Sequence, residues 1–400
     1  MHICFICDEY PPAPHGGSGS SYRDLSEGLV AQGHQVTVVG VYKNPQWHGG
    51  KGVDETINGV RVVRLPSSPS WLRYKLQTLS DRLKISRWLK CEHQKNPFDI
   101  IEASDYGGWL RFGGPAGVPT IVRIRGSNYF FDVELKRNGD PFEHKIEEAA
   151  LARADFIGSV SRYASERTLD ICKLSHRSCT VIHNAVDMDL FSPSPGVSRE
   201  RGLIVFVNSI NPKKGIEQLI DAMNVVCAKF PEAKLAVIGQ DTQKPVDGIT
   251  YVEKLKQRMK PEFLDRVIFT GRMDRYKGVL DYLRRAHICC YPSHMETFGI
   301  AAIEAMSIGK PTIFSETGPG PEVIEHGVSG LLCNPHDALD LADKIVAILS
   351  SDELAERLGT NARCRVETLF NKKHWVQRNV EFYERCISSN SHENGRCGCK

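Results

Sequence analysis

Two glutamates, Glu296 and Glu304, carry the strongest chemical signal in the sequence. A short apolar strand leads into a loop that holds Glu296, and a helix that starts near Gly299 places Glu304 in its second turn. Small side chains at this helix start would let phosphate oxygens reach the backbone N–H groups of Phe298, Gly299 and Ile300. Glu304 could then accept hydrogen bonds from both hydroxyls of a ribose, and Glu296, nearer the mouth, could reach sugar hydroxyls. The alternative for two glutamates at this spacing is a structural ion pair.

A pair of lysines precedes a second helix. Lys213 and Lys214 follow a predicted strand at 203–208 and come at the start of a predicted helix at 214–229. At the positive end of a helix dipole, Lys214 could project over a cleft and neutralise a departing diphosphate. Two solvated lysines in a surface turn are the alternative.

Glycines cluster after the first predicted strand, at 2–7. Gly16, Gly17 and Gly19 lie at the start of a predicted helix, where glycine lets the backbone approach a phosphate closely. Their spacing is not G-x-G-x-x-G, which argues against a nicotinamide-dependent dehydrogenase. A glycine-rich loop without a ligand is the alternative.

All three segments follow short runs rich in Val and Ile, which are typical of parallel strands covered on both faces. A chain of 400 residues predicts two domains. The predicted strands lie at 2–7, 35–40, 60–65, 99–103, 119–124, 155–160 and 179–182 in the first, and at 203–208, 234–239, 266–270, 287–291 and 311–314 in the second. Open α/β sheets bind ligands at the carboxyl ends of their strands, so we expect the active site in a cleft between the domains.

The predicted organisation is an α/β protein with two Rossmann-like domains that face each other. The first domain covers residues 1–190, and the second follows a Pro- and Ser-rich stretch and covers 191–370. An amphipathic helix at 371–388 is expected to pack back on the first domain. We expect residues 389–400 to form a disordered tail.

Composition narrows the classes of function. The 51 Lys and Arg against 48 Asp and Glu leave a net charge of +3, too small to favour nucleic-acid binding. The cysteines, 13 in all, lie mostly in apolar runs of a long chain, so we expect them to be reduced and buried. We expect no signal peptide, because the first predicted strand is followed at once by Asp8 and Glu9, and no run approaches the roughly 20 apolar residues of a membrane span. We therefore expect a cytoplasmic protein.

Residues 71–95 combine apolar side chains with seven Lys and Arg residues in a helical pattern. Such a basic amphipathic helix could make weak peripheral contact with the inner face of a membrane, where a lipid-linked acceptor would be found. An ordinary helix with its apolar face on the sheet and its charges in water is the favoured interpretation.

Further motifs join these segments to a known family. They are the glycine-rich first loop, the linker at 184–191 (NAVDMDLF), the Glu-x7-Glu run, the loop at 317–324 (TGPGPEVI) and the run at 326–332 (HGVSGLL). Together they resemble the retaining GT-B glycosyltransferases that include sucrose synthase, glycogen synthase and bacterial mannosyltransferases. The resemblance implies the first domain on the acceptor side, the second binding a nucleotide sugar, and these roles: Gly17 near the donor phosphates, Lys214 on the diphosphate, Glu296 on the donor sugar and Glu304 on the ribose.

The same resemblance bears on metal binding. Asp187-Met188-Asp189 spells the D-x-D sequence that binds a metal in the other glycosyltransferase fold. Here it falls in the family's linker motif. We therefore expect no catalytic metal and no cofactor, with the nucleotide sugar acting as a substrate.

The chain departs from the family pattern at two places. Asn208-Ser209-Ile210 stands where the family usually has Gly-Arg-Leu, so the arginine that joins the lysine on the diphosphate is absent, and Ser209 could donate only a neutral hydrogen bond. Arg125 takes the place of a histidine that often touches the donor sugar in relatives. We hypothesise that Arg125 restores a positive charge near the leaving group.

The expected reaction is metal-independent transfer of a sugar, with retention, from a nucleotide diphosphate donor to a saccharide or lipid-linked acceptor. UDP is the first expectation for the donor nucleotide and GDP the second, and the expected pathway is cell-surface polysaccharide or glycoconjugate synthesis. The alternatives are a nucleotide-sugar epimerase or a phosphorylase on the same fold, and a catalytically silent nucleotide-sugar-binding protein.

Overall fold

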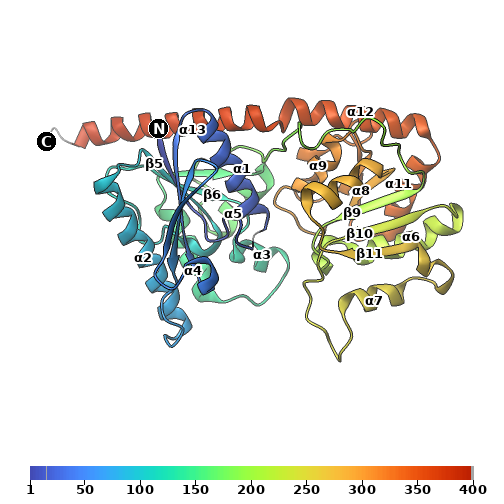
Figure 1. Ribbon diagram of the computed structural model, residues 1–400, viewed down its shortest axis with the longest axis horizontal. Coiled ribbons are helices and arrows are strands. Elements are labelled where there is room, and N and C mark those ends of the chain that lie inside the picture. The colour runs from blue at the N-terminus through green and yellow to red at the C-terminus, as the bar shows by residue number, and fades with distance from the viewer. Residues whose placement is uncertain (15, 398–400) are drawn as a thin grey trace. The chain divides into compact units, whose positions relative to one another are not determined.

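The computed structural model describes the backbone of residues 1–14 and 16–397, and the side chains as far as residue 390. The chain forms two compact units. Unit 1 contains Met1–Ile182 and the C-terminal segment from Lys373, and unit 2 contains His183–Lys372. In Figure 1 the colours run from blue to green through unit 1 and on through yellow and orange in unit 2, before the red C-terminal helix lies along unit 1.

Unit 1 contains an eight-stranded sheet with the order β3-β4-β2-β1-β5-β6-β7-β8. All neighbouring strands are parallel except β3 and β4, which are antiparallel. The strands are β1 (His2–Ile6), β2 (Gln35–Tyr42), β3 (Val53–Ile57), β4 (Val60–Pro66), β5 (Ile100–Ser104), β6 (Thr120–Ile124), β7 (Phe156–Ser159) and β8 (Thr180–Val181). Every residue of β1, β5 and β6 is buried, as expected for strands with helices on both faces.

The sequence analysis missed the edge strand β3. Its central residues are exposed and polar, so it lacks the apolar run by which the other strands were recognised. The turn to β4 is formed by Asn58 and Gly59, whose φ angles are 49° and 81°. An Asn-Gly pair with two positive φ angles is the favoured two-residue hairpin turn, and this pair was the available signal.

Helices cover the sheet of unit 1, and α1 and α2 both contact β2. The α-helices are α1 (Gly17–Ala31), α2 (Tyr74–Lys95), α3 (Asn128–Glu134), α4 (Pro141–Arg153), α5 (Arg162–Ile171) and α13 (Lys372–Cys397), with 3-10 turns η1 (Pro45–Trp47) and η2 (Tyr106–Gly108). The predicted return of a C-terminal helix to the first domain is confirmed by α13. This helix is assigned as far as Cys397, whereas the sequence analysis expected a disordered tail at 389–400, and 398–400 lie outside the described residues.

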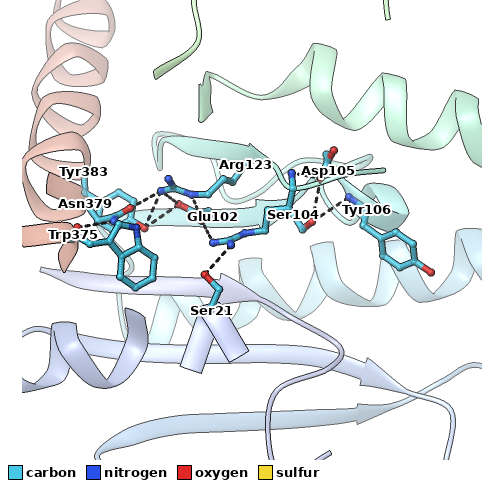
Figure 2. Close-up of polar contacts among 10 residues, drawn as sticks. Ser21, Glu102, Ser104, Asp105, Tyr106, Arg123, Trp375, Asn379 and Tyr383 are labelled. Carbon is cyan, nitrogen blue, oxygen red and sulfur yellow. Dashed lines mark hydrogen bonds and ion pairs between the residues drawn. The ribbon is translucent and has the colours of Figure 1, made fainter. Parts of the chain in front are cut away.

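A buried polar network attaches α13 to the sheet (Figure 2). Arg123 of β6 donates two hydrogen bonds to Glu102 of β5, at 2.7 and 2.6 Å, and a third to Asn379 of α13 at 2.8 Å. The Tyr383 hydroxyl donates to the same Glu102 carboxylate at 2.9 Å. Since the Arg123 and Glu102 side chains are only 2% and 0% exposed, each charge depends on the other for its stability.

Unit 2 contains a six-stranded parallel sheet with the order β11-β10-β9-β12-β13-β14. Its strands are β9 (Leu203–Val207), β10 (Lys234–Ile238), β11 (Val267–Gly271), β12 (Ile288–Tyr291), β13 (Thr312–Ser315) and β14 (Leu331–Cys333). Its helices are α6 (Ile216–Lys229), α7 (Tyr251–Arg258), α8 (Leu280–Arg285), α9 (Ile300–Ser307), α10 (Gly320–Val323), α11 (Ala338–Leu349) and α12 (Asp352–Leu369), with short helical turns η3 (Pro212–Lys214), η4 (Pro261–Arg266) and η5 (Arg275–Val279).

The first boundary between the units lies earlier than predicted. The sequence placed it at 190/191, but the chain enters unit 2 at His183. The His183 ring stacks on Phe298 with centroids 5.6 Å apart, and Val186 forms a backbone bridge to Asn371. These contacts assign the linker motif to unit 2.

Both sheets have the strand order of a Rossmann fold. Numbered along the chain, the strands of unit 2 run 3-2-1-4-5-6 across the sheet, and the parallel strands β4-β2-β1-β5-β6-β7 of unit 1 run in the same way. In such sheets the order reverses beside the first strand, and ligands bind at the carboxyl ends of the strands at that switch point. The switch points are β9/β12 in unit 2 and β1/β5 in unit 1.

Candidate functional site

The switch point of unit 2 brings together two of the residues predicted from the sequence. Lys214 lies in the loop after β9, and Glu296 lies in the loop after β12. The Lys214 Nζ and a Glu296 carboxylate oxygen are 2.5 Å apart, with side chains 11% and 15% exposed. A cation and a carboxylate thus share the position where this type of sheet holds ligands.

A glycine allows the two loops to approach. Gly215 has a φ of 67°, and a Cβ added there would lie 1.7 Å from the carbonyl oxygen of Pro292. Any other residue would push the loops apart. The helix predicted at 214–229 therefore starts later, at Ile216, and Lys214 belongs to the turn η3 before it.

A further hydrogen bond holds the Glu296 carboxylate. Ser293 donates from its hydroxyl to the same Glu296 oxygen at 3.1 Å. The charges of Lys214 and Glu296 neutralise each other in this pair. A ligand that contains both a diphosphate and a sugar could bind the Lys214 ammonium through its diphosphate and the Glu296 carboxylate through its sugar hydroxyls. The pair is therefore suited to exchange an internal contact for contacts with such a ligand.

The helix α9 starts at Ile300 and is preceded by Gly299. Gly299 has a φ of 98°, and a Cβ at this position would lie 2.5 Å from the Phe314 ring, so glycine is required here. Phe298 is 1% exposed and packs in the core. Only its backbone could therefore contact a donor nucleotide sugar. The predicted small helix start is thus present.

Glu304 lies in α9 and is only 4% exposed. Its carboxylate forms an ion pair with the guanidinium of Arg275, which also lies 5.4 Å from the centre of the Phe191 ring. A buried carboxylate needs such a cation. The sequence analysis missed Arg275, because nothing in the exposed segment around it indicates which cation forms an ion pair with Glu304.

Ser209 follows β9, at the first departure from the family pattern described above. Its hydroxyl accepts a hydrogen bond from the Asn211 side chain at 2.9 Å. The residue thus contributes no charge, while Lys214 and Arg275 form ion pairs with the two predicted glutamates.

The glycine-rich loop of unit 1 already has a carboxylate at its helix start. Glu9 accepts hydrogen bonds from the backbone N–H groups of Gly16 at 2.9 Å and of Gly19 at 2.7 Å. An anion is expected at a helix N-terminus, and here the chain supplies one itself. A donor phosphate at Gly16 or Gly17 would compete with Glu9 for these groups.

Arg125 is buried in unit 1, with its side chain 4% exposed. Its guanidinium donates to the Ser21 hydroxyl at 2.9 Å, lies 4.5 Å from the centre of the Tyr22 ring and is 4.0 Å from Glu102. These contacts place it beside the network that holds α13. Lys214 belongs to the other unit.

The first aspartate of the D-x-D sequence stabilises its own loop. Asp187 accepts hydrogen bonds from the backbone N–H groups of Asp189 and Leu190, both at 3.2 Å, and lies 3.6 Å from the Lys372 ammonium. Across the described residues, no group of three or more His, Cys, Asp or Glu side chains is arranged to hold a metal ion.

The basic segment at 71–95 divides into two parts. Helix α2 starts at Tyr74 and buries residues such as Ile85 and Leu89 against the sheet, as the favoured interpretation expected. Its start is exposed, with Trp71 81% and Leu76 55% accessible. None of the helices in the described part of the chain is long and apolar enough to cross a membrane.

Eleven of the cysteines lie among the residues described without masking, and all eleven are free thiols. Cys91 and Cys364 are exposed and Cys179 is intermediate, while the other eight are buried. The prediction that the cysteines are mostly buried is confirmed for these residues.

Comparisons with known proteins extend over both units. The family described as "Glycosyltransferase Family 4" matches residues 15–190, and the one described as "Glycosyl transferases group 1" matches residues 187–365. An uncharacterised glycosyltransferase of Methanocaldococcus jannaschii is 27% identical over 409 residues, which cover 96% of this chain and 98% of that protein.

Solved structures show the same fold. Sucrose-phosphate synthase from Thermosynechococcus elongatus superposes with a TM-score of 0.81 and 25% identity over 97% of this chain and 100% of that one. HepE of Anabaena in complex with UDP-glucose gives a TM-score of 0.73 at 19% identity, over 96% and 100% of the two chains. The fold is GT-B, and the chain belongs to the group 1 family of glycosyltransferases.

Proposed function

We propose that the protein transfers a hexose, with retention and without a metal or other cofactor, from a nucleotide diphosphate sugar to a saccharide or lipid-linked acceptor. The observation that carries this proposal is the Lys214–Glu296 pair at the switch point of unit 2. Glu304, buried on the neighbouring helix, completes the set of groups that a diphosphate, a sugar and a ribose require.

The proposed chemistry follows from charge. As the bond between the sugar C1 and the phosphate oxygen breaks, negative charge grows on the diphosphate, and Lys214 and the start of α9 stabilise it more than the ground state. The acceptor hydroxyl oxygen forms the new bond to C1 on the same face. Its proton passes to the departing phosphate oxygen, so no carboxylate nucleophile of the kind found in retaining hydrolases is needed.

UDP is our first choice for the nucleotide and GDP the second. The complex of HepE with UDP-glucose supports this order. A carboxylate such as Glu304 binds the ribose of either nucleotide, so the base must be distinguished by other groups.

For the acceptor, we propose a saccharide of cell-surface polysaccharide or glycoconjugate synthesis, free or linked to a lipid, in the cytoplasm. The exposed Trp71 and Leu76 beside Arg73 and Lys75 support contact with an anionic membrane surface. This contact would involve the start of α2 and not the whole of 71–95. We expect the wild type to bind phosphatidylglycerol vesicles and Trp71→Ala to lose this binding. Equal binding by the wild type and the variant would exclude membrane contact through the start of α2.

The experiment that tests the proposed function is thermal stabilisation by UDP-, GDP- and ADP-sugars in EDTA, followed by a transfer assay. We expect one nucleotide series to stabilise the protein, Glu304→Gln to lose the shift, and Glu325→Gln, a surface control in the same unit, to keep it. A shift without transfer to any acceptor would favour a silent binding protein. Dependence on free phosphate would favour a phosphorylase, and conversion of the donor sugar without an acceptor would favour an epimerase.

A further inference from the structure

Two histidines of unit 2 meet near the surface. His294 lies in the loop after β12, and His336 lies in the segment between β14 and α11. Their Nδ1 atoms are 3.0 Å apart, and the ring centroids are 4.4 Å apart with an angle of 68° between the planes. His294 is half-buried, whereas His336 is exposed. One nitrogen of each imidazole thus faces the same nitrogen of the other.

Gln218, near the start of α6, determines which nitrogen of His294 carries the hydrogen. The Gln218 carbonyl oxygen Oε1 lies 2.8 Å from His294 Nε2. Because a carbonyl oxygen can only accept, Nε2 carries the hydrogen, and the lone pair of the neutral ring lies on Nδ1. Histidines that bind metal ions through one nitrogen usually donate the other ring N–H to an oxygen in this way. The free lone pair of His294 is therefore on the atom that faces His336.

The surroundings of His294 favour its neutral form. Burial lowers the pKa of His294 below the ordinary value of 6.5, and His336 lowers it further, while the Glu217 carboxylate raises it by less. Two protonated imidazoles in contact would also repel each other. The His294 ring is therefore neutral at pH 7, which is the form that binds metal ions.

The separation of the two nitrogens fits a shared metal ion. Bonds from Zn²⁺ to imidazole nitrogen are about 2.0–2.1 Å long, so two bonds of this length to atoms 3.0 Å apart enclose an angle of roughly 90–100°. This is close to the angle between neighbouring ligands in square-planar or octahedral coordination, and rotation of the exposed His336 ring would widen it toward the tetrahedral value. Imidazole is a preferred ligand of Zn²⁺, Ni²⁺ and Cu²⁺.

We infer that His294 and His336 form a two-histidine site for a divalent transition-metal ion, bound through Nδ1 of both rings. Gln218 is a positioning residue of this site, and water fills the other coordination positions. To offer its second lone pair, His336 moves its hydrogen from Nδ1 to Nε2, so binding releases no proton from the neutral pair. The ion takes no part in the proposed sugar transfer, and the inference does not rest on that function.

A bound ion would restrain the loop that carries Glu296. The backbone N–H of His294 donates to the Lys213 carbonyl oxygen at 2.9 Å, so the loops after β9 and β12 are already joined. A bond to His336 would join the segment before α11 to the same two loops. Because the ion binds the folded arrangement, it should also raise the temperature of unfolding.

The test titrates the full chain, freed of metal with EDTA and then dialysed, with NiCl₂ alone in a calorimeter at neutral pH. We expect Ni²⁺ to bind the wild type, and to bind His294→Asn and His336→Asn at least roughly tenfold more weakly. Because both rings bind one ion, the double variant should lose no more affinity than either single variant. His176→Asn, which removes an exposed histidine from unit 1, should bind as the wild type does.

Two variants of Gln218 separate its positioning role from general packing. Gln218→Leu removes the oxygen that holds His294 and should weaken Ni²⁺ binding roughly tenfold, whereas Gln218→Glu supplies an oxygen at the same place and should retain the affinity. Urea unfolding identifies any loss of folding, and the exposed His336→Asn serves if His294→Asn is unstable. The inference is overturned if the wild type binds Ni²⁺ no more tightly than His336→Asn, or if the two single losses add in the double variant.

Discussion

The two units share a strand order but use their charged residues in different ways. In unit 2, Lys214 and Glu296 follow the strands on either side of the switch point and form an ion pair. In unit 1, Arg123 points from within a strand into the interior, where it binds Glu102 and helix α13. Charges in loops at strand ends are available to a ligand, whereas charges within strands stabilise the fold.

The largest effect is expected from the network of unit 1. Arg123→Met leaves the Glu102 carboxylate buried without its main cation and should lower the free energy of unfolding by about 3–5 kcal/mol. Arg285→Met, which breaks an exposed pair in unit 2 with Glu200, should cost less than about 1 kcal/mol. Urea unfolding measures the free energy of unfolding of both variants. Equal losses in the two variants would contradict the proposed difference between the buried charges of unit 1 and the exposed charges of unit 2.

The next effect concerns catalysis in unit 2. Lys214→Ala should lower kcat by about 10²–10³-fold, because the diphosphate loses a cation during bond cleavage. Lys213→Ala is the matched control, because it removes a neighbouring ammonium group. The variant keeps the backbone carbonyl of residue 213, which accepts a hydrogen bond from the His294 N–H. If Lys214→Ala and Lys213→Ala had the same kcat, Lys214 would have no part in stabilising the leaving group.

Arg125 lies between the two classes: nothing described tests the leaving-group role hypothesised from the sequence, and its buried contacts favour a structural role instead. From its buried contacts with Ser21 and Glu102, we expect Arg125→Met to cost about 1–3 kcal/mol of stability and to leave kcat of the folded enzyme within a few-fold. A large loss of kcat at unchanged stability would instead support the leaving-group hypothesis and make Arg125 resemble Lys214.

The smallest effect is expected at Arg275. Removal of its guanidinium leaves the buried Glu304 without its cation, so Arg275→Ala should raise KM for the donor roughly tenfold, or about 1.4 kcal/mol, while kcat changes less. Arg275→Lys should restore part of the affinity, and Arg272→Ala, an exposed neighbour, should have no effect. Steady-state kinetics with varied donor concentration would show whether Glu304 needs this partner.

The sequence by itself determined the fold class and the loops in which the donor site is predicted. Short Val- and Ile-rich strands alternate with helices, and the loops that carry Lys214, Glu296 and Glu304 follow such strands directly. Because parallel strands place their carboxyl ends on one edge of a sheet, the chemistry of these loops could be predicted from local order along the chain.

Only the tertiary structure decided which charged groups meet. Glu9 occupies the helix start that was expected to receive a phosphate, Arg275 serves Glu304, and Arg123 reaches Asn379 across a separation of 256 residues. A buried charge requires a partner, but the requirement does not specify which one, because the choice depends on distances in space that local sequence pattern does not encode.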